Sequence, residues 1–389
     1  MYKSFFLSAI VIAAYGPFLS TYIPVELGGV SLFSVILPNL MALMSLFTRR
    51  ISNKVSVGFL AGNVVLILTI ALLRSVFYKE HFLELLLTSW PIWVLLILAL
   101  LSSQRGYKSN RREKNIFVYL ILSLCLLHTI NSVLFIQKII WINNGFDNSG
   151  YEILWGRFRG VLGGANIQGV YNAYLFYCLW KFIKMPFHWS LILWLTALVS
   201  VVPTLSRGGI LVLVFMLFDV FLVASSRQKR YLVIMTIIIS VYSRGFITEL
   251  SLIQRFMTGD VTSGRLDKLM YFFDLLASEN IFLILGIPRY LQSIDVELSD
   301  NSFVALFASL GTFLFLWIIG IKYIRKYNGI RWRIDAFFLS IMCVLFLNNA
   351  YIWIPWLFLI IPSLILIHGN ESIIGQPQSG FYRRNSKMD

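Results

Sequence analysis

The sequence predicts an all-α membrane protein that crosses the bilayer many times. Hydrophobic residues make up 58% of its 389 residues and charged residues 13%, whereas soluble domains contain about 45–50% apolar and about 25% charged residues. The apolar runs are long and unbroken, which is typical of membrane-spanning helices and not of the short alternating strands of a membrane barrel. This composition excludes a soluble enzyme, a disordered chain and a secreted disulfide scaffold.

Twelve apolar runs are long enough to cross the bilayer. A hydrocarbon core of about 30 Å needs about 20 residues of helix. The short gap at Asn348, Asn349 and Tyr351 leaves a re-entrant hairpin open for the last two runs. The twelve runs cover residues 4–23, 28–47, 55–73, 82–102, 115–135, 164–183, 187–204, 208–225, 231–248, 301–321, 334–350 and 352–368.

The basic residues predict the orientation of these helices. If the N-terminus lies in the cytoplasm, every inner segment carries Lys or Arg, and most of the 33 basic residues fall on this side although the outer loops are longer. The positive-inside rule then predicts an even number of spans, with both termini in the cytoplasm. The expected organisation is helices one to five (residues 1–135), a first large periplasmic loop (136–163), helices six to nine (164–244), a larger periplasmic loop (245–300), helices ten to twelve (301–368) and a cytoplasmic tail (369–389).

The larger periplasmic loop contains an amphipathic segment, from Arg265 to Ala277. Its apolar residues fall on one face at helical spacing, and its charged residues fall elsewhere. We therefore expect a helix that lies on the outer membrane–water boundary or caps a cavity. The expected apolar face consists of Leu266, Leu269, Met270, Phe273 and Leu276.

Arg207 lies on the predicted outer side, where arginine is scarce, at the start of the eighth run. Ser206 precedes it, and Gly208 and Gly209 follow in the first helical turn. The free N–H groups of a helix N-terminus favour an anion, and arginine adds donors suited to phosphate oxygens. The two glycines would let a ligand approach the backbone closely. The alternative is an arginine that pairs with lipid headgroups.

Two further arginine segments on the same side repeat this arrangement. Arg265 follows Ser263, which can cap the amphipathic helix, and Arg157 and Arg159 precede the glycine-rich start of the sixth run, which holds Asn166. Each segment alone could be an exposed loop charge. Together the three favour a shared anionic ligand, such as a diphosphate at the membrane surface.

The acidic residues offer a candidate base and a structural pair. Asp300 opens the tenth run, where a carboxylate near a sugar hydroxyl can act as a general base, and the alternative is that it caps the helix. Asp219 lies inside the eighth run near its inner end, and we expect a structural pairing there. The histidines lack partners at metal-ligand spacing and the cysteines lie inside apolar runs, so we expect no metal site, no disulfide and no cofactor.

The order of these motifs resembles the O-antigen polymerase and O-antigen ligase superfamily. Arg159-Gly160 is followed by Asn166, then by residues 205–208 (Leu-Ser-Arg-Gly), then by residues 263–265 (Ser-Gly-Arg), and finally by a helix over residues 301–311 after a large loop. The resemblance covers about residues 155–315. It implies a multi-pass protein of the bacterial inner membrane with about twelve helices, large periplasmic loops and a GT-C-like glycosyltransferase architecture.

The resemblance also implies a function and a set of site residues. Members of this superfamily join sugar chains carried on undecaprenyl diphosphate at the outer face of the inner membrane, without a metal. The expected partners are these lipid-linked oligosaccharides, membrane lipids and a chain-length regulator protein, with no nucleic acid. The resemblance implies that Arg207 and Arg265 hold the diphosphate, and to these we add Arg157 and Arg159. The expected sugar-binding residues are Asn166, Ser206 and Asn301.

Several function classes stay open. The ligase branch usually shows a histidine before the late helix, and residues 298–302 contain none, which favours a polymerase and leaves Asp300 as the candidate base. An O-antigen ligase stays an alternative. A flippase or other transporter of lipid-linked oligosaccharides would be expected to show internal repeats, broken helices and midplane charges, and no repeat relates residues 1–190 to 191–389. A scaffold without chemistry would leave the outward arginines unexplained.

Reporter fusions test the predicted orientation. Reporters near Gly145 and Val261 should signal from outside the cytoplasm, and reporters near Ser109, Gln228 and Asn328 from inside it, because the basic residues gather on the inner side. A cytoplasmic signal at Val261 would contradict both the topology and the function that it supports.

Overall fold

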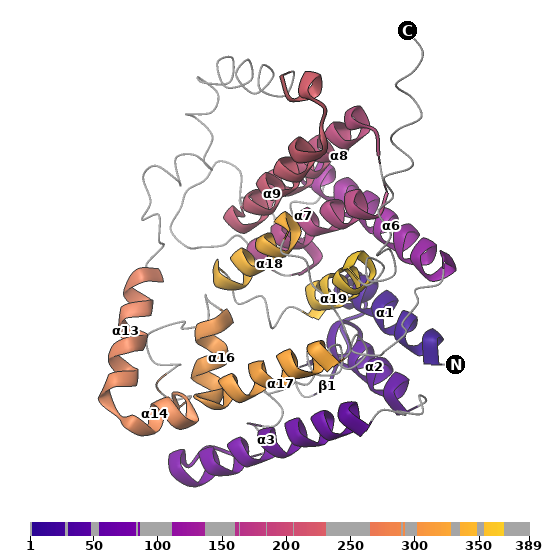
Figure 1. The fold of residues 1–389 in the computed structure, drawn as a ribbon. Helices are drawn as coiled ribbons and strands as arrows, with labels where there is room; N and C mark the ends of the chain where they lie inside the picture. Colours follow the sequence, from indigo (N-terminus) through magenta and orange to yellow (C-terminus); the bar gives the residue numbers. More distant parts are fainter. Residues whose placement is uncertain are drawn as a thin grey trace.

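The computed structural model, shown in Figure 1, describes residues 2–27, 30–47, 54–82, 85, 111–136, 160–162, 164–183, 185–204, 206–230, 265–288, 291, 302–327, 335–347 and 354–368. Within these ranges the regular structure is helical apart from a short hairpin, in which β1 (Glu26–Leu27) pairs antiparallel with β2 (Val30–Ser31). The all-α prediction is therefore confirmed. Most of the predicted run 82–102, the whole of 231–248 and most of the first periplasmic loop lie outside the described residues.

Helices make up the remaining elements. In chain order they are α1 (Tyr2–Tyr22), α2 (Leu37–Phe47), α3 (Lys54–Tyr78), α6 (Arg111–Ile136), α7 (Ala165–Phe182), α8 (Phe187–Val201), α9 (Arg207–Val223), α13 (Arg265–Ser278), α14 (Asn280–Leu285), α16 (Ser302–Leu310), α17 (Phe313–Tyr327), α18 (Ala336–Leu347) and α19 (Ile354–His368). A π-helical turn, η1 (Leu32–Ile36), precedes α2, and 3₁₀ turns η2 (Gly160–Leu162) and η3 (Val202–Thr204) precede α7 and α9.

The outward faces of the long helices are apolar. On α3 the exposed side chains include Val65, Leu68, Leu72 and Val76, which recur every three or four residues and are 41–66% exposed. Within the described residues, three segments are long and apolar enough to cross a membrane: Ala61–Tyr78, Lys114–Leu134 and Phe187–Thr204. Apolar stripes that face outward at helical spacing are typical of helices in lipid, so the structure supports a membrane protein.

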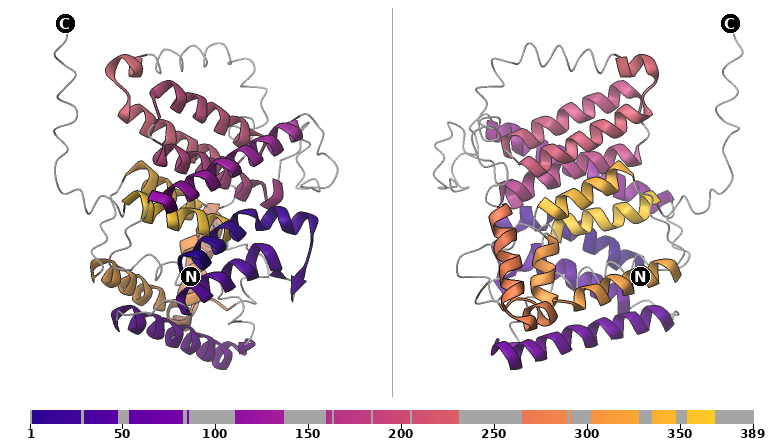
Figure 2. Two further views of the ribbon diagram at one scale, coloured as in Figure 1. Left: turned by 90° about the vertical axis from the view of Figure 1, so that its right-hand side faces the viewer. Right: turned by 60° about the vertical axis from the view of Figure 1, so that its left-hand side comes forward.

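α7 lies at the centre of the fold, packed among α6, α8, α9, α18 and α19 (Figures 1 and 2). Every residue from Val170 to Leu179 is at most 2% exposed. A helix that is buried on all sides contacts protein and not lipid, which explains why α7 can carry polar side chains. Its tyrosines at 171, 174 and 177 are fully buried, and the Tyr174 hydroxyl lies 3.0 Å from the Ser340 hydroxyl of α18.

Glycines bring α7 and α9 into direct backbone contact. A Cβ atom built on Gly209 would lie 2.7 Å from the carbonyl carbon and oxygen of Gly169, and one built on Gly169 would collide with the side chains of Ser206 and Thr204. A side chain at either position would therefore force the two helices apart. Gly209 serves helix packing, whereas the sequence interpretation assigned it to close approach of a ligand.

The predicted tenth run, residues 301–321, is not one helix. It is divided into α16 and α17 at Gly311, whose φ of +55° is left-handed. A Cβ atom there would collide with the backbone of Ile284 and Gly286. The prediction of one continuous span was wrong because the average hydropathy of a run carries no information about the conformation of a single residue.

The break in this run pairs with the end of α14. The Ile287 amide donates to the Ala308 carbonyl oxygen at 2.8 Å, and the Thr312 amide donates to the Leu283 carbonyl oxygen at 2.9 Å. Gly286, with a φ of +81°, ends α14 in a second left-handed turn directly against α16. Residues 283–287 and 308–312 together form what we call the α14–α16 junction.

The α14–α16 junction sets the orientation of α13 and α16 relative to α3 and α17. α3 and α17 lie side by side, and α13 and α16 stand across them in both Figure 1 and the right-hand view of Figure 2.

α13 confirms the predicted amphipathic helix, but its buried side chains are Phe272 and Leu276, whereas Met270 and Phe273 are 58% and 53% exposed. The apolar surface of α13 is therefore wider than the protein covers.

A pair of glycine variants tests the contact between α7 and α9. Gly169→Ala should lower the free energy of unfolding by about 1–3 kcal/mol, because the added methyl group overpacks the contact with Ser206 and Thr204. Gly62→Ala on α3 meets nothing within 4 Å and should stabilise the helix by about 0.5–1 kcal/mol. Thermal unfolding in lipid nanodiscs measures both, and equal effects of the two variants would contradict the packing of α7 on α9.

Candidate functional site

The first turns of α7 and α9 meet at one place, which we call the α7–α9 corner. Ser206 is the N-cap of α9: its hydroxyl accepts a hydrogen bond from the Gly209 amide at 3.2 Å and donates to the Asn166 carbonyl oxygen at 3.3 Å. The Ser206 amide donates to the Thr204 hydroxyl at 3.3 Å. Three residues that the sequence predicted for the site, Asn166, Ser206 and Arg207, therefore lie together.

The turn that follows Arg159 packs against the same corner. Gly160 has a left-handed φ of +60°, and a Cβ atom on it would collide with the Gln168 side chain. The Leu162 amide donates to Gln168 Oε1 at 3.3 Å. The backbone next to Arg159 is thus held beside α7, while Arg157 and Arg159 themselves lie outside the described residues.

A buried polar network supports the corner from inside the bundle. Gln168 Nε2 lies 2.8 Å from His128 Nδ1 and donates to Asn172 Oδ1 at 2.6 Å. Asn172 Nδ2 in turn donates to the Ser200 carbonyl oxygen at 3.0 Å, and the Ser132 hydroxyl donates to the same oxygen at 3.1 Å. All five side chains are at most 1% exposed, so this network holds α6, α7 and α8 in a fixed arrangement.

Sequence reasoning missed this network. Polar residues four positions apart, such as Gln168 and Asn172, lie on one helix face. Inside an apolar run such a pair is expensive unless it is hydrogen-bonded within the protein. This spacing is the signal that could have identified the buried face of α7.

Arg207 is the first residue of α9 and is half-buried. The amides at the start of a helix have no intrahelical partners and carry partial positive charge. The guanidinium group adds a full charge at this point. The α7–α9 corner is therefore the candidate site for an anion, beside Ser206 and Asn166.

The other predicted site residues are placed less completely. Arg265 is the first residue of α13, in agreement with the predicted helix start. α13 and α9 begin on the same side of the molecule (Figures 1 and 2). Asp300 and Asn301 lie outside the described residues, directly before α16.

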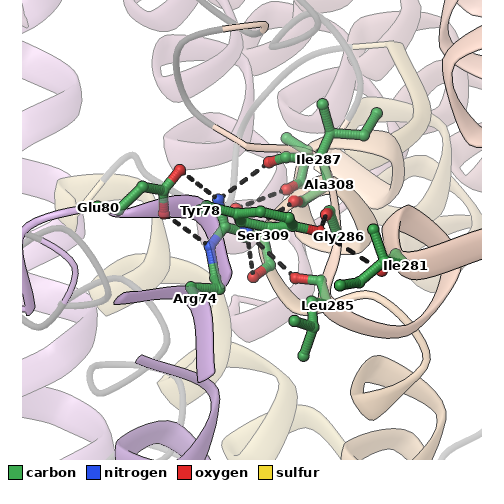
Figure 3. Close-up of polar contacts among 10 residues, drawn as sticks. Arg74, Tyr78, Glu80, Ile281, Leu285, Gly286, Ile287, Ala308 and Ser309 are labelled. Carbon is green, nitrogen blue, oxygen red and sulfur yellow. Dashed lines mark hydrogen bonds and ion pairs between the residues drawn. The ribbon is translucent and has the colours of Figure 1, made fainter. Parts of the chain in front are cut away.

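A second arginine that the sequence analysis did not single out is fully engaged within the protein. Arg74, on the last full turn of α3, is 3% exposed. Its Nε and Nη2 atoms lie 3.0 and 3.2 Å from the two carboxylate oxygens of Glu80. Its remaining donors reach four backbone carbonyl oxygens of the α14–α16 junction and its neighbours (Figure 3), those of Leu285 at 3.2 Å, Ile287 at 2.9 Å, Ala308 at 3.2 Å and Ser309 at 3.1 Å.

Tyr78 completes this cluster, which we call the Arg74 clamp. The Tyr78 hydroxyl donates to the Gly286 carbonyl oxygen at 2.7 Å, and its ring centroid lies 5.5 Å from the Arg74 guanidinium carbon. Carbonyl groups at the end of a helix lack intrahelical donors. The clamp supplies these donors, so its role is structural, and it is distinct from the α7–α9 corner.

The opposite end of α7 is joined by ion pairs. Lys181 Nζ lies 2.6 Å from Asp219 Oδ2 on α9 and 3.0 Å from Asp335 Oδ2 before α18. The Tyr177 hydroxyl donates to Asp219 Oδ2 at 2.6 Å. The predicted structural pairing of Asp219 is confirmed. Among the described residues, no three His, Cys, Asp or Glu side chains come together as metal ligands would.

Substitutions at Arg74 test the clamp. Arg74→Ala should lower the free energy of unfolding by about 3–5 kcal/mol, because it breaks the buried ion pair with Glu80 and removes the donors to four carbonyl oxygens. Arg74→Lys should recover part of this loss, since lysine keeps the charge but lacks the planar fork of donors. Lys79→Ala, which removes an exposed charge close by, is the matched control. Thermal unfolding in nanodiscs is the measurement, and a wild-type midpoint for Arg74→Ala would contradict the clamp.

Comparison with known proteins assigns no family to the chain. No protein-family model matches the sequence, and neither a curated protein nor a solved structure matches it.

Proposed function

We propose that this protein is a polysaccharide polymerase of the bacterial inner membrane. In this proposal it joins oligosaccharide repeat units carried on undecaprenyl diphosphate, at the periplasmic face, and both of its termini lie in the cytoplasm. The product is an O-antigen, a capsule or another exopolysaccharide.

The observation that carries the proposal is the α7–α9 corner. Asn166 lies 40 residues before Ser206 and its neighbour Arg207 in the sequence, and all three were expected to bind parts of one lipid-linked substrate. They meet at two helix starts, where amide groups and a guanidinium favour a diphosphate. The buried network around Gln168 keeps the start of α7 in position, and an anion site needs donors that are held in place.

The contacts of α7 support the proposed orientation. Lys181 contacts both Asp219 and Asp335, and all three belong to helix ends for which the basic residues predict the cytoplasmic side. Asn166 and Ser206 also contact each other, and both belong to ends predicted to be periplasmic. Helix ends that were assigned to the same side are thus neighbours in space.

The proposed reaction is a direct transfer. The hydroxyl oxygen of one lipid-linked unit attacks the anomeric carbon of the donor unit, and a carbon–oxygen bond forms there. The bond from that carbon to the diphosphate oxygen breaks, and undecaprenyl diphosphate leaves with the electron pair. Arg207 and Arg265 stabilise the charge on this leaving group, while Asp300 is the candidate acceptor of the hydroxyl proton.

A transporter of lipid-linked oligosaccharides is the second candidate, because two observations favour it. The break between α16 and α17 and the buried Arg74–Glu80 pair are features that transporters often have. In transporters such breaks bind the substrate near the midplane, whereas here the donors of Arg74 are engaged by the chain itself. We therefore rank the transporter below the polymerase.

Purified protein in nanodiscs distinguishes these functions. With lipid-linked repeat units alone, the wild type should produce longer lipid-linked chains. Arg207→Ala and Arg265→Ala should each lower the rate about 10²–10³-fold, because each removes a donor to the leaving group. Lysine at either position should rescue only partly. Arg230→Ala removes an exposed arginine that follows α9 on the predicted inner side, and it should have no effect.

Three outcomes would contradict the proposal. Full polymerisation by both alanine variants would exclude the proposed diphosphate contacts. Movement of labelled units across a proteoliposome membrane without lengthening would favour the transporter. A deletion strain that accumulates full-length chains on the carrier lipid would favour a ligase.

A further inference from the structure

The exposed surface of α13 and α14 is apolar on one side. Met270 and Phe273 of α13 are 58% and 53% exposed, and Leu283 and Ile284 of α14 are 40% and 51% exposed. Phe272 and Leu276 of α13 pack on the protein. Large apolar side chains exposed in a group indicate a partner.

This surface continues onto the neighbouring helices. The exposed stripe of α3 ends in Leu72 and Val76, and the start of α17 exposes Phe315 and Leu316 at 56% and 57%. α14 lies between these two helix ends, since it contacts α3 and, through the α14–α16 junction, the turn before α17. The segment Ala61–Tyr78 of α3 is apolar and long enough to cross a membrane.

The Arg74 clamp fixes the position of the α14–α16 junction along the axis of α3. Arg74 precedes the end of α3 at Tyr78 by one helical turn, which is about 6 Å along the axis. Its guanidinium binds the carbonyl groups of Leu285, Ile287 and Ala308. If the α3 segment spans the bilayer, the junction lies about one turn below its end, a depth typical of interfacial helices.

We propose that α13 and α14 form a platform embedded in the bilayer, and that lipid hydrocarbon covers its apolar surface. The lipid belongs to the leaflet at the Tyr78 end of α3. Asp274, which is exposed on α13, faces water. α13 and α14 are therefore inserted in the membrane and do not form a water-exposed loop. This inference is independent of the proposed function, since it rests on burial and on the clamp alone.

Site-directed spin labelling tests the platform in the full-length protein. Single cysteines at Phe273, Ile284 and Asp274 are labelled with a nitroxide after reconstitution in nanodiscs, and their accessibility to oxygen and to a water-soluble nickel chelate is measured. Leu72→Cys serves as the lipid-exposed control. The unsubstituted chain gives the background labelling, because Cys125 and Cys178 are buried and Cys343 is half-buried.

The expected ratio of oxygen to nickel accessibility exceeds one at Phe273, Ile284 and Leu72, and falls below one at Asp274. A ratio below one at both Phe273 and Ile284 would mean that water covers the surface, and it would overturn the proposal. Low accessibility to both reagents, with dipolar broadening at Phe273, would also overturn it, because a second copy of the chain would then cover this face.

Discussion

A helix that ends within a bilayer leaves carbonyl groups that water does not satisfy, and Arg74 supplies the donors for those of the α14–α16 junction. Its guanidinium binds four carbonyl oxygens and the Glu80 carboxylate in one plane of donors. Because these contacts join α3 to two other segments of the chain, the positions of α13, α16 and α17 depend on them. A lysine could not make the same set of bonds.

The second constraint is the burial of α7. One end of this helix carries the Gln168 network and the contact with Ser206, and the other end carries the Lys181 ion pairs. The Gln168, Asn172 and Lys181 side chains are hydrogen-bonded or ion-paired inside the protein, as low-dielectric surroundings require. His128 Nε2 is buried without a hydrogen-bond partner among the described residues. The candidate anion site therefore sits on a rigid support, which is what a reaction that depends on fixed donors needs. The proposed polymerase activity relies on this arrangement.

Hydropathy predicted the helical class, the membrane character and most helix positions, because these depend on averages over many residues. The amphipathic spacing predicted α13, and the burial of an acid predicted the pairing of Asp219. The break at Gly311 depends on one backbone angle, which no average contains. Arg74 was not singled out because its four carbonyl partners lie more than two hundred residues away in sequence. Contacts between residues far apart in sequence, including that between Gly169 and Gly209, follow from the fold alone.

Solid-state NMR in lipid bilayers would measure the Arg74 clamp most directly. Arginine side-chain nitrogens are labelled with ¹⁵N, and the backbone carbonyls of leucine, isoleucine and alanine are labelled with ¹³C. Dipolar dephasing then reports nitrogen–carbon proximity. The account predicts dephasing from the guanidinium to the carbonyl carbons of Leu285, Ile287 and Ala308, and its loss in Arg74→Lys. Identical dephasing in the wild type and in Arg74→Lys would contradict it.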